Sequence, residues 1–191
     1  VKAKIKFQKA FQIQPNHATL CNNFGATLIQ LGEYQKAISY LQKAIQIQPN
    51  YAHAYNNFGS VLIEVEQQEK AISYLQKAIQ IQPNLTDAHV NLGLAFKELG
   101  EFQKAIDSFQ KTIQIQPRNI KAHQNLMESY ERINKEKELK NAISNAKNFI
   151  NGNAIIKLYE AIILYNNNQF TEAKNYLESI LFDVGSAKNE I

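Results

Sequence analysis

The sequence Gln-Ile-Gln-Pro occurs at residues 12–15, 46–49, 80–83 and 114–117, and these four copies contain every proline of the chain. Each copy follows the previous one after 34 residues. A unit of this length is too short to bury its own apolar face, so a constant period of this size indicates a stacked array in which each unit packs against its neighbours. The sequence therefore predicts a repeat protein rather than a domain with one central core.

Composition limits the class of protein. Of the 191 residues, 45% are hydrophobic, the net charge is +4, and no apolar run approaches the roughly 20 residues that span a bilayer. The single cysteine, Cys21, excludes an internal disulfide framework and favours a reducing compartment. We therefore expect a cytoplasmic protein that does not bind membranes. Because the chain begins at Val1 in the middle of a unit, we also expect further sequence upstream.

Each unit is predicted to be a helical hairpin. In the first whole unit, apolar residues recur at three- and four-residue spacing over residues 18–30 and 34–47, which is typical of amphipathic helices. Gly32 lies between the two segments and readily adopts the positive φ that ends a helix, while Pro49 blocks continuation of the second helix. In the second unit Glu66 replaces the turn glycine, which predicts either a turn without a left-handed residue or a strained one.

The period divides the whole chain. We expect one array over residues 1–191, made of the second helix of an incomplete unit (1–16), three regular units (17–50, 51–84 and 85–118), two degenerate units (119–152 and 153–183) and a tail (184–191). In the fourth unit, Met127 and Asn134 replace the two glycines of the pattern, and no proline closes the unit.

One family shares this pattern. Asn-x-Gly-x-x-Leu at residues 23–28, Leu-Gly-x-Tyr at 31–34, Lys-Ala-Ile at 36–38 and the closing Pro-Asn resemble the tetratricopeptide repeat, and the resemblance extends over nearly the whole chain. It implies an all-α fold, a right-handed superhelical solenoid of antiparallel helix-turn-helix hairpins, whose first helices line a concave groove that binds extended peptides. Small residues such as Gly25, Ala37 and Ala44 suit the close approach of packed helices.

An asparagine recurs every 34 residues on the first helices of the first four units, at Asn23, Asn57, Asn91 and Asn125, which we call the ladder asparagines. At 100° per residue, Asn23 lies about 160° around its helix from Gly25, which faces the partner helix, so Asn23 points away from that helix. A side-chain amide can pair with the C=O and N–H of an extended backbone. A similar asparagine ladder lines the repeats of the O-linked N-acetylglucosamine transferases. We therefore predict a peptide-binding groove that contains Asn22, Asn23, Asn56, Asn57, Asn91 and Asn125. Local contacts are the alternative role for these asparagines.

Chaperone-binding members of the family hold a C-terminal carboxylate with lysines and an arginine in the groove. Asn22 and Asn56 stand in this groove instead, so the resemblance disfavours a heat-shock chaperone tail as the ligand.

The first helix of the fifth unit breaks the amphipathic pattern. Residues 154–165 are apolar nearly all round, with Ile155, Tyr159 and Ile162 on the face that should line the groove. Because a helix of this kind is normally buried, we predict that this face packs against further chain, binds an apolar partner or joins two copies. The tail is too short to cap the stack, which also favours self-association or a shortened chain.

The sequence carries no catalytic constellation. His89 and His123 occupy the inward position held by Cys21 and Tyr55 in earlier units, so we predict packed core residues rather than metal ligands, which must converge on one point. Phosphate-binding glycine loops and nucleophile elbows are absent, so we expect no enzyme, cofactor or metal. Acidic residues in the predicted groove, such as Glu64 and Glu98, disfavour nucleic acid as a partner.

We therefore predict a scaffold that binds a protein or an extended peptide. Two alternatives remain. The region from Asn125 to residue 181 resembles the repeats that precede bacterial sulfotransferase domains, which implies a recognition array of a larger sulfotransferase or glycosyltransferase. The apolar fifth unit instead favours a self-assembling structural module.

Overall fold

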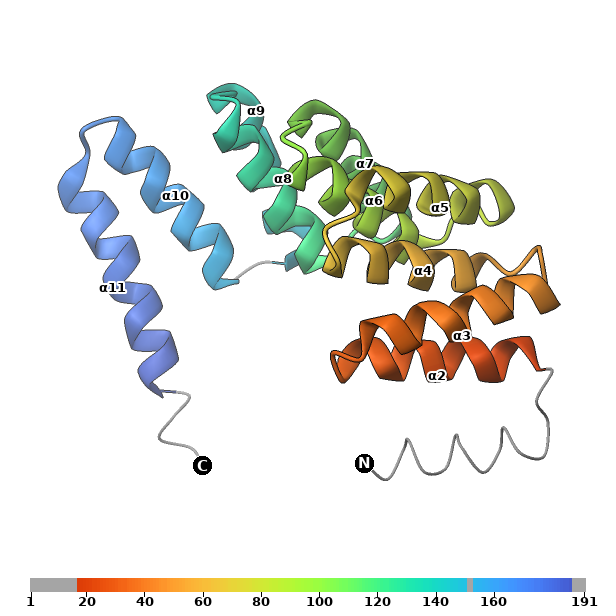
Figure 1. The fold of residues 1–191 in the computed structure, drawn as a ribbon. Helices are drawn as coiled ribbons and strands as arrows, with labels where there is room; N and C mark the ends of the chain where they lie inside the picture. The colour runs from red at the N-terminus through yellow and green to blue at the C-terminus, as the bar shows by residue number, and fades with distance from the viewer. Residues whose placement is uncertain (1–16, 151–152, 187–191) are drawn as a thin grey trace. The chain divides into compact units, whose positions relative to one another are not determined.

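The computed structural model describes residues 17–150 and 153–186, and these residues form helices and turns without a strand (Figure 1). The helices are α2 (Ala18–Gln30), α3 (Tyr34–Ile47), α4 (Ala52–Glu64), α5 (Gln68–Ile81), α6 (Thr86–Glu98), α7 (Phe102–Ile115), α8 (Ile120–Arg132), α9 (Glu136–Ile150), α10 (Ala154–Asn166) and α11 (Phe170–Ser186). The helix predicted over 1–16 and the end of the tail lie outside the described residues.

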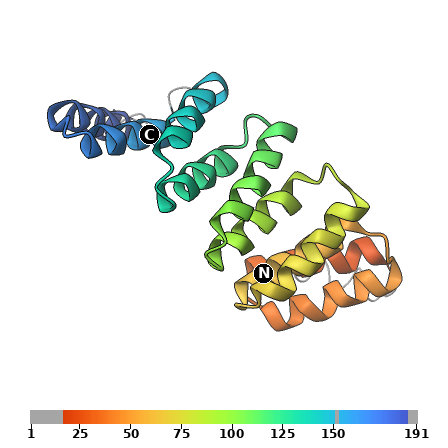
Figure 2. The same cartoon turned by 90° about the horizontal axis from the view of Figure 1, so that it is seen from above.

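From here on, each 34-residue hairpin is called a repeat. The chain forms two compact parts, which we call unit 1 (residues 1–115) and unit 2 (residues 116–191). In unit 1, the helix pairs α2–α3, α4–α5 and α6–α7 form three consecutive hairpins, coloured red to green in Figure 2. In unit 2, α8–α9 and α10–α11 form two more. The observed bounds of α2 and α3 equal the predicted ones. The prediction of an all-α helical repeat fold is confirmed.

Glycines let the two helices of each hairpin in unit 1 approach closely. A Cβ atom added to Gly25 would lie 2.6 Å from Cγ of Leu41, and one added to Gly59 would lie 2.5 Å from Cγ of Leu75. Both leucines have no exposed surface. Burying a leucine side chain contributes about 2 kcal/mol to stability, so this close packing is a substantial part of each hairpin's free energy of unfolding.

Successive hairpins in unit 1 share one apolar core. Phe24, Leu41, Phe58 and Leu75 belong to a single buried cluster. Half-buried isoleucines of the second helices pack against this cluster, and they recur at equivalent positions of the first two repeats: Ile38, Ile45, Ile72 and Ile79. The second helix of one repeat is thereby joined to the next hairpin by apolar contact.

The hairpin turns all use a left-handed residue. Glycine occupies this position in two repeats, with φ of 71° at Gly32 and 74° at Gly100. Glu66 adopts the same conformation with φ of 58°, so the strained alternative predicted for this turn is confirmed. Asn134 and Asn168 take the position in unit 2, at φ of 54° and 61°.

Unit 2 departs from the glycine pattern at its first hairpin. Met127 stands where Gly25 stands in the first repeat and is fully buried, so α8 and α9 leave room for a long side chain between them. The last helix, α11, continues to Ser186, three residues beyond the predicted end of the fifth repeat at 183.

Candidate functional site

The candidate site lies on the first helices of unit 1, which are neighbours in space: α2 contacts α4, and α4 contacts α6. The predicted asparagines fall into two groups on these helices. Asn23 is exposed, and Asn57 and Asn91 are half-buried. Asn22 and Asn56 are only 4% and 5% exposed. The prediction that Asn22 and Asn56 line a groove is therefore wrong, because both side chains point into the space between neighbouring first helices.

Side-chain amides connect these helices in a continuous chain of hydrogen bonds, which we call the amide relay. Asn91 Nδ2 donates to Asn56 Oδ1 at 2.9 Å, and Asn56 Nδ2 donates to Asn57 Oδ1 at 3.3 Å. Asn57 Nδ2 then donates to Asn22 Oδ1 at 2.8 Å, and Asn22 Nδ2 donates to Asn23 Oδ1 at 3.2 Å. The buried amides are satisfied by this pairing, as a low-dielectric interior requires.

Within unit 1, the third repeat has no buried asparagine. Val90 occupies the position that Asn22 and Asn56 hold in the earlier repeats, and its side chain offers no polar atom. Asn125 of unit 2 occupies the position equivalent to Asn57, but its Nδ2 donates to the carbonyl oxygen of Lys121 on its own helix at 2.8 Å. Asn23, Asn57 and Asn91 of unit 1 thus belong to one hydrogen-bonded system.

A second periodic contact follows the same helices and was not predicted. The hydroxyl of Tyr34 donates to Glu64 Oε2 at 3.2 Å, and Gln68 Nε2 donates to Glu98 Oε2 at 2.8 Å one period later. The hydrogen bond and the carboxylate charge raise the pKa of Tyr34. Each pair joins the start of a second helix to the end of the next first helix. The constant separation of 30 residues could have indicated these pairs in the sequence.

An acidic hollow adjoins this second contact. Its volume is about 610 Å³, and it is lined by Ile63, Glu64, Glu66, Gln68 and Glu98. It lies at the carboxyl end of the stripe that carries Asn57 and Asn91, where the two helices α4 and α6 end.

The inward histidines and the cysteine are core residues, as predicted. His89 is 7% exposed and His123 is 1% exposed. Their Nε2 atoms lie 2.8 Å from the carbonyl oxygens of Pro83 and Pro117, so each ring donates its Nε2 hydrogen to the end of the preceding repeat. Cys21 is fully buried, and burial raises the pKa of its thiol. The described side chains include no group of three or more His, Cys, Asp or Glu suited to a metal ion.

Comparison with known families decides the identification. Two models of the tetratricopeptide repeat match the sequence, one over residues 16–84 and the other over 86–119, and together they cover more than half of the chain. The chain belongs to the tetratricopeptide repeat family. No curated protein matches the sequence.

Solved structures agree with this tetratricopeptide repeat assignment. A crystal structure of MamA is 31% identical, covers 76% of this chain and 88% of its own, and has a TM-score of 0.66. YrrB, a tetratricopeptide repeat protein with an unusual peptide-binding site, is 18% identical over 92% of this chain and 90% of its own, with a TM-score of 0.71. The first tetratricopeptide repeat domain of Spaghetti, bound to an HSP90 peptide, is 20% identical over 61% of this chain and 93% of its own, with a TM-score of 0.60. The last two show the fold alone.

The apolar surface predicted for the fifth tetratricopeptide repeat is only partly exposed. Tyr159 is only 7% exposed, while Ile155 and Ile162 are half-buried. Burial raises the pKa of Tyr159 to about 12, and the charges of Glu128 and Glu131 on α8 add to this rise. The prediction that Tyr159 contacts a partner is wrong, because its side chain faces the preceding repeat, as Asn57 does in unit 1.

The exposed apolar side chains of this repeat lie elsewhere on its two helices. They are Leu158, Tyr165, Phe170, Tyr176 and Leu177. Within the described part of the chain, no helix is suited to crossing a membrane.

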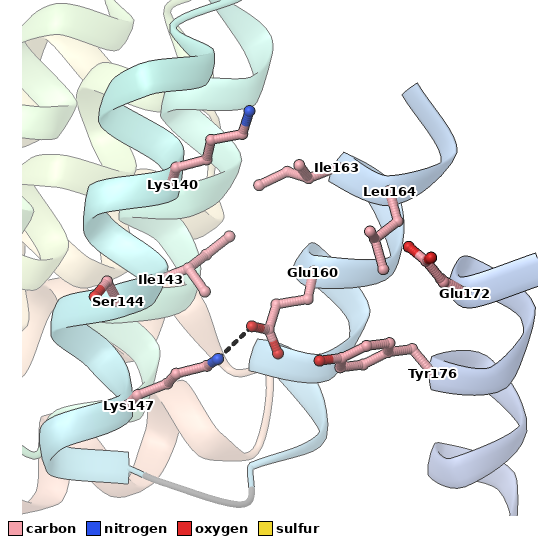
Figure 3. A pocket seen from close by; sticks show the side chains of 9 residues that line it. All are labelled: Lys140, Ile143, Ser144, Lys147, Glu160, Ile163, Leu164, Glu172 and Tyr176. Carbon is pink, nitrogen blue, oxygen red and sulfur yellow. Dashed lines mark ion pairs between the residues drawn. The ribbon is translucent and has the colours of Figure 1, made fainter. Parts of the chain in front are cut away.

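An open hollow separates α9 from the last tetratricopeptide repeat hairpin (Figure 3). Its volume is about 450 Å³, and its apolar lining includes Ile143, Ile163, Leu164 and the ring of Tyr176. Lys147 of α9 reaches across and pairs with Glu160 of α10. This ion pair raises the pKa of Lys147.

Proposed function

We propose that unit 1 binds an extended peptide through the face of α2, α4 and α6 that carries Asn23, Asn57 and Asn91. One observation carries the proposal: these amides keep hydrogen-bonding groups after the relay is complete. A side-chain amide has two N–H donors and an oxygen with two lone pairs. Asn57 donates one N–H and uses one lone pair, so one of each remains. Peptide backbones present matching groups at every second residue along one edge.

Relatives support a peptide ligand. Among proteins with this fold, YrrB has an unusual peptide-binding site and the first tetratricopeptide repeat domain of Spaghetti binds an HSP90 peptide. In the present chain the amides would pair with main-chain groups of any sequence, whereas a terminal carboxylate would call for cationic side chains.

The remaining predicted residues take different roles in this proposal. Asn22 and Asn56 are buried supports of the ladder amides and do not touch the ligand. The proposed site is confined to unit 1 and does not include Asn125 of unit 2, whose Nδ2 donates to the carbonyl oxygen of Lys121.

The proposal is tested with peptides that are selected from a random display library for binding to the whole chain. The double variant Asn57→Ala with Asn91→Ala should bind the selected peptides about tenfold or more weakly, because each lost hydrogen bond contributes about 1 kcal/mol. Affinity is measured by fluorescence anisotropy of the labelled peptide.

Asn141→Ala is the matched control, since Asn141 is an exposed asparagine on α9. It should leave the affinity unchanged. Equal affinity of the double variant and the wild type would contradict the proposal, provided that both melt cooperatively. Loss of several kcal/mol of stability in the double variant would show that these amides are structural instead.

A second candidate function is self-association through the last repeat. The observation that favours it is the cluster of apolar side chains on α10 and α11, with Tyr165 63% exposed and Phe170 54% exposed. Their rings contact each other at 5.2 Å between centroids. An exposed apolar patch of this kind is typical of protein contact sites.

Light scattering tests this second function. Tyr165→Lys with Phe170→Lys should reduce an oligomeric mass to that of a monomer. Leu31→Lys is the control, because Leu31 is 48% exposed at a turn of the first repeat and should not matter. A mass that stays the same in the double variant would contradict self-association through this patch.

We further propose a cytoplasmic protein that carries out no reaction and needs no cofactor. The single thiol of the chain is buried, which suits a reducing compartment.

A further inference from the structure

The hollow between α9 and the last hairpin corresponds to a place that a phenylalanine ring occupies in unit 1. Glu160, which lines the hollow, stands at the position of Phe24 and Phe58 in the first two repeats. Both phenylalanines are buried in the core cluster of unit 1. The carboxylate of Glu160 instead pairs with Lys147 of α9. Because a glutamate is smaller than a phenylalanine and this one is turned toward a lysine, space remains in the junction.

The last repeat keeps the tyrosine that packs on this phenylalanine in unit 1. Tyr40 lies edge-on to Phe24 with 4.7 Å between the ring centroids, and Tyr74 stacks on Phe58 at 4.3 Å. Tyr176 follows Tyr74 after three periods, and its ring lines the hollow (Figure 3). In the part of the chain that the structure describes, this ring contacts no other aromatic ring.

The two positions change together in the other repeats. Where leucine replaces the phenylalanine, in the third and fourth repeats, a small residue replaces the tyrosine, and the pairs are Leu92 with Ser108 and Leu126 with Ala142. Of the five whole repeats, only the last combines the tyrosine with a residue that is not aromatic. Tyr176 therefore lacks the ring that this position packs against elsewhere, and its side chain is 36% exposed.

The charges around the hollow favour a cation as the occupant. Lys147 is paired with Glu160, and Lys140 is paired with Glu136, so both lysines of the lining are already compensated. Glu172 also lines the hollow and makes no ion pair with the residues that the structure describes. The lining thus has one carboxylate in excess of its paired charges.

Glu172 and Tyr176 lie one helical turn apart on α11, and both side chains project toward the hollow (Figure 3). The carboxylate accepts a hydrogen bond from the neutral amide of Gln169 at 2.6 Å, which leaves its charge uncompensated. Side chains at this spacing have Cβ atoms about 5–6 Å apart. A molecule with a ring against Tyr176 and an ammonium group beside Glu172 therefore needs a linker of about two carbons between them.

We propose that this hollow binds a small aromatic amine, with its ring against Tyr176 and its ammonium group beside Glu172. Ile143, Ile163 and Leu164 provide apolar contacts around the ring. The volume of about 450 Å³ is in the range of small-molecule pockets. Aromatic rings attract each other in offset or edge-to-face packing, and a primary amine is charged at neutral pH, as lysine is. The site belongs to unit 2 and does not depend on peptide binding by unit 1.

Titration of the whole chain with four probes tests this chemistry. 2-Phenylethylamine has the ring and the charge, 2-phenylethanol lacks the charge, phenylacetate has the opposite charge, and 2-cyclohexylethylamine lacks the aromatic ring. Methyl signals of Ile143, Ile163 and Leu164 in ¹H–¹³C spectra report binding. 2-Phenylethylamine should bind roughly threefold more tightly than the alcohol or the cyclohexyl amine, and phenylacetate should bind least. Absent shifts with 2-phenylethylamine, or equal affinity for amine, alcohol and carboxylate, would overturn the proposal.

A double variant that fills the hollow tests its location. Lys147→Ile with Glu160→Phe returns the phenylalanine of unit 1 to its place beside Tyr176 and should abolish binding of 2-phenylethylamine. Circular dichroism checks that the helices are retained. Binding that persists in the folded double variant would overturn the proposal.

Glu172→Gln tests the charge without filling the hollow, and it decides the matter if the double variant does not fold. It should lower the affinity for 2-phenylethylamine to that for 2-phenylethanol and leave the affinity for the alcohol unchanged. Glu178→Gln is the matched control, because Glu178 is an exposed glutamate of α11 outside the lining and should affect neither probe. An unchanged preference for the amine in Glu172→Gln would overturn the assignment of the ammonium site.

Discussion

The junctions between repeats differ in chemistry between the two units. In unit 1, the half-buried isoleucines Ile38 and Ile45 of α3 pack against the core cluster that includes Phe58 of the next repeat. Three periods later, the equivalent positions are Lys140, Lys147 and Glu160. At this second junction, a hollow of about 450 Å³ and one ion pair replace the apolar contact.

This difference separates two properties of a repeat array. The period of 34 residues is kept at both junctions, and the helical hairpin forms at both. The isoleucine–phenylalanine positions of unit 1 are occupied by Lys147 and Glu160 at the second junction, although other apolar side chains, such as Ile143 and Ile163, line it. Because a repeat array is stabilised by its repeats and by nearest-neighbour interfaces separately, a charged interface can weaken the contact without unfolding the hairpins beside it.

The largest expected effect concerns the glycine that differs between the units. Gly59→Met should destabilise unit 1 by about 3 kcal/mol, because its Cβ would lie 2.5 Å from Leu75 Cγ and 3.3 Å from the carbonyl oxygen of Ala71. Urea unfolding followed by circular dichroism measures the loss. The converse change, Met127→Gly, should cost about 2–4 kcal/mol through the cavity that it leaves. A Gly59→Met variant as stable as the wild type would show that α4 and α5 can open as α8 and α9 do.

The next effect concerns the charged junction. Lys147→Ile alone should destabilise unit 2 by about 1–2 kcal/mol, because Glu160, whose side chain is 20% exposed, would lose its partner. Adding Glu160→Phe restores the apolar pair of unit 1 and should recover that loss or exceed the wild type by about 1 kcal/mol. Thermal melting at low and high salt tests both changes. If the double variant were less stable than Lys147→Ile alone, an apolar pair at this junction would not be more stable than the ion pair.

Tyr159 occupies the position in the fifth repeat that Asn57 occupies in the second, and its phenol should make the stability of unit 2 depend on pH. The pKa of Tyr159 is raised to about 12, so the folded state keeps its proton at a pH where the unfolded chain loses it. Stability from this residue is complete below pH of about 10 and declines as the pH rises toward 12. Tyr159→Phe should therefore flatten the decline in this window. If the stability of the wild type and of the variant declined equally with pH, the phenol of Tyr159 would be exposed to water in the folded state.

The smallest effect concerns the turns. Glu66→Gly should stabilise the chain by about 0.5–1 kcal/mol, because glycine adopts the φ of 58° at less cost. Gly32→Glu makes the opposite change at the equivalent turn, which has open space around it, and should destabilise by a similar amount. Opposite signs in urea unfolding would confirm the comparison. Equal signs would contradict backbone strain as the cause.

Local features were predictable from the sequence. Gly32 and Pro49 mark the ends of helices directly, and the spacing of apolar residues fixes which face is buried, so the bounds of α2 and α3 agree with the prediction. The inward position of His89 followed from the same periodicity. Each of these depends on one helix or one turn.

Contacts between repeats were not predictable in the same way. The angle of a residue around its own helix does not give the distance to the first helix of the next repeat. Asn22 and Asn56 were therefore assigned to the groove, although both are buried. Tyr159 was misplaced for the same reason. The column of Asn22, Asn56 and Val90 was the available signal, since two buried amides that end at a valine suggest internal pairing rather than ligand contact.

Peptide binding by the first helices of unit 1 is tested most directly by titrating the whole chain with a library-selected peptide and recording its side-chain amide signals. Signals of Asn23, Asn57 and Asn91 should shift on binding, while those of Asn125 and Asn141 in unit 2 should stay in place. Shifts confined to Asn125 and its neighbours, with the ladder of unit 1 unchanged, would contradict the assignment of peptide binding to the amide relay.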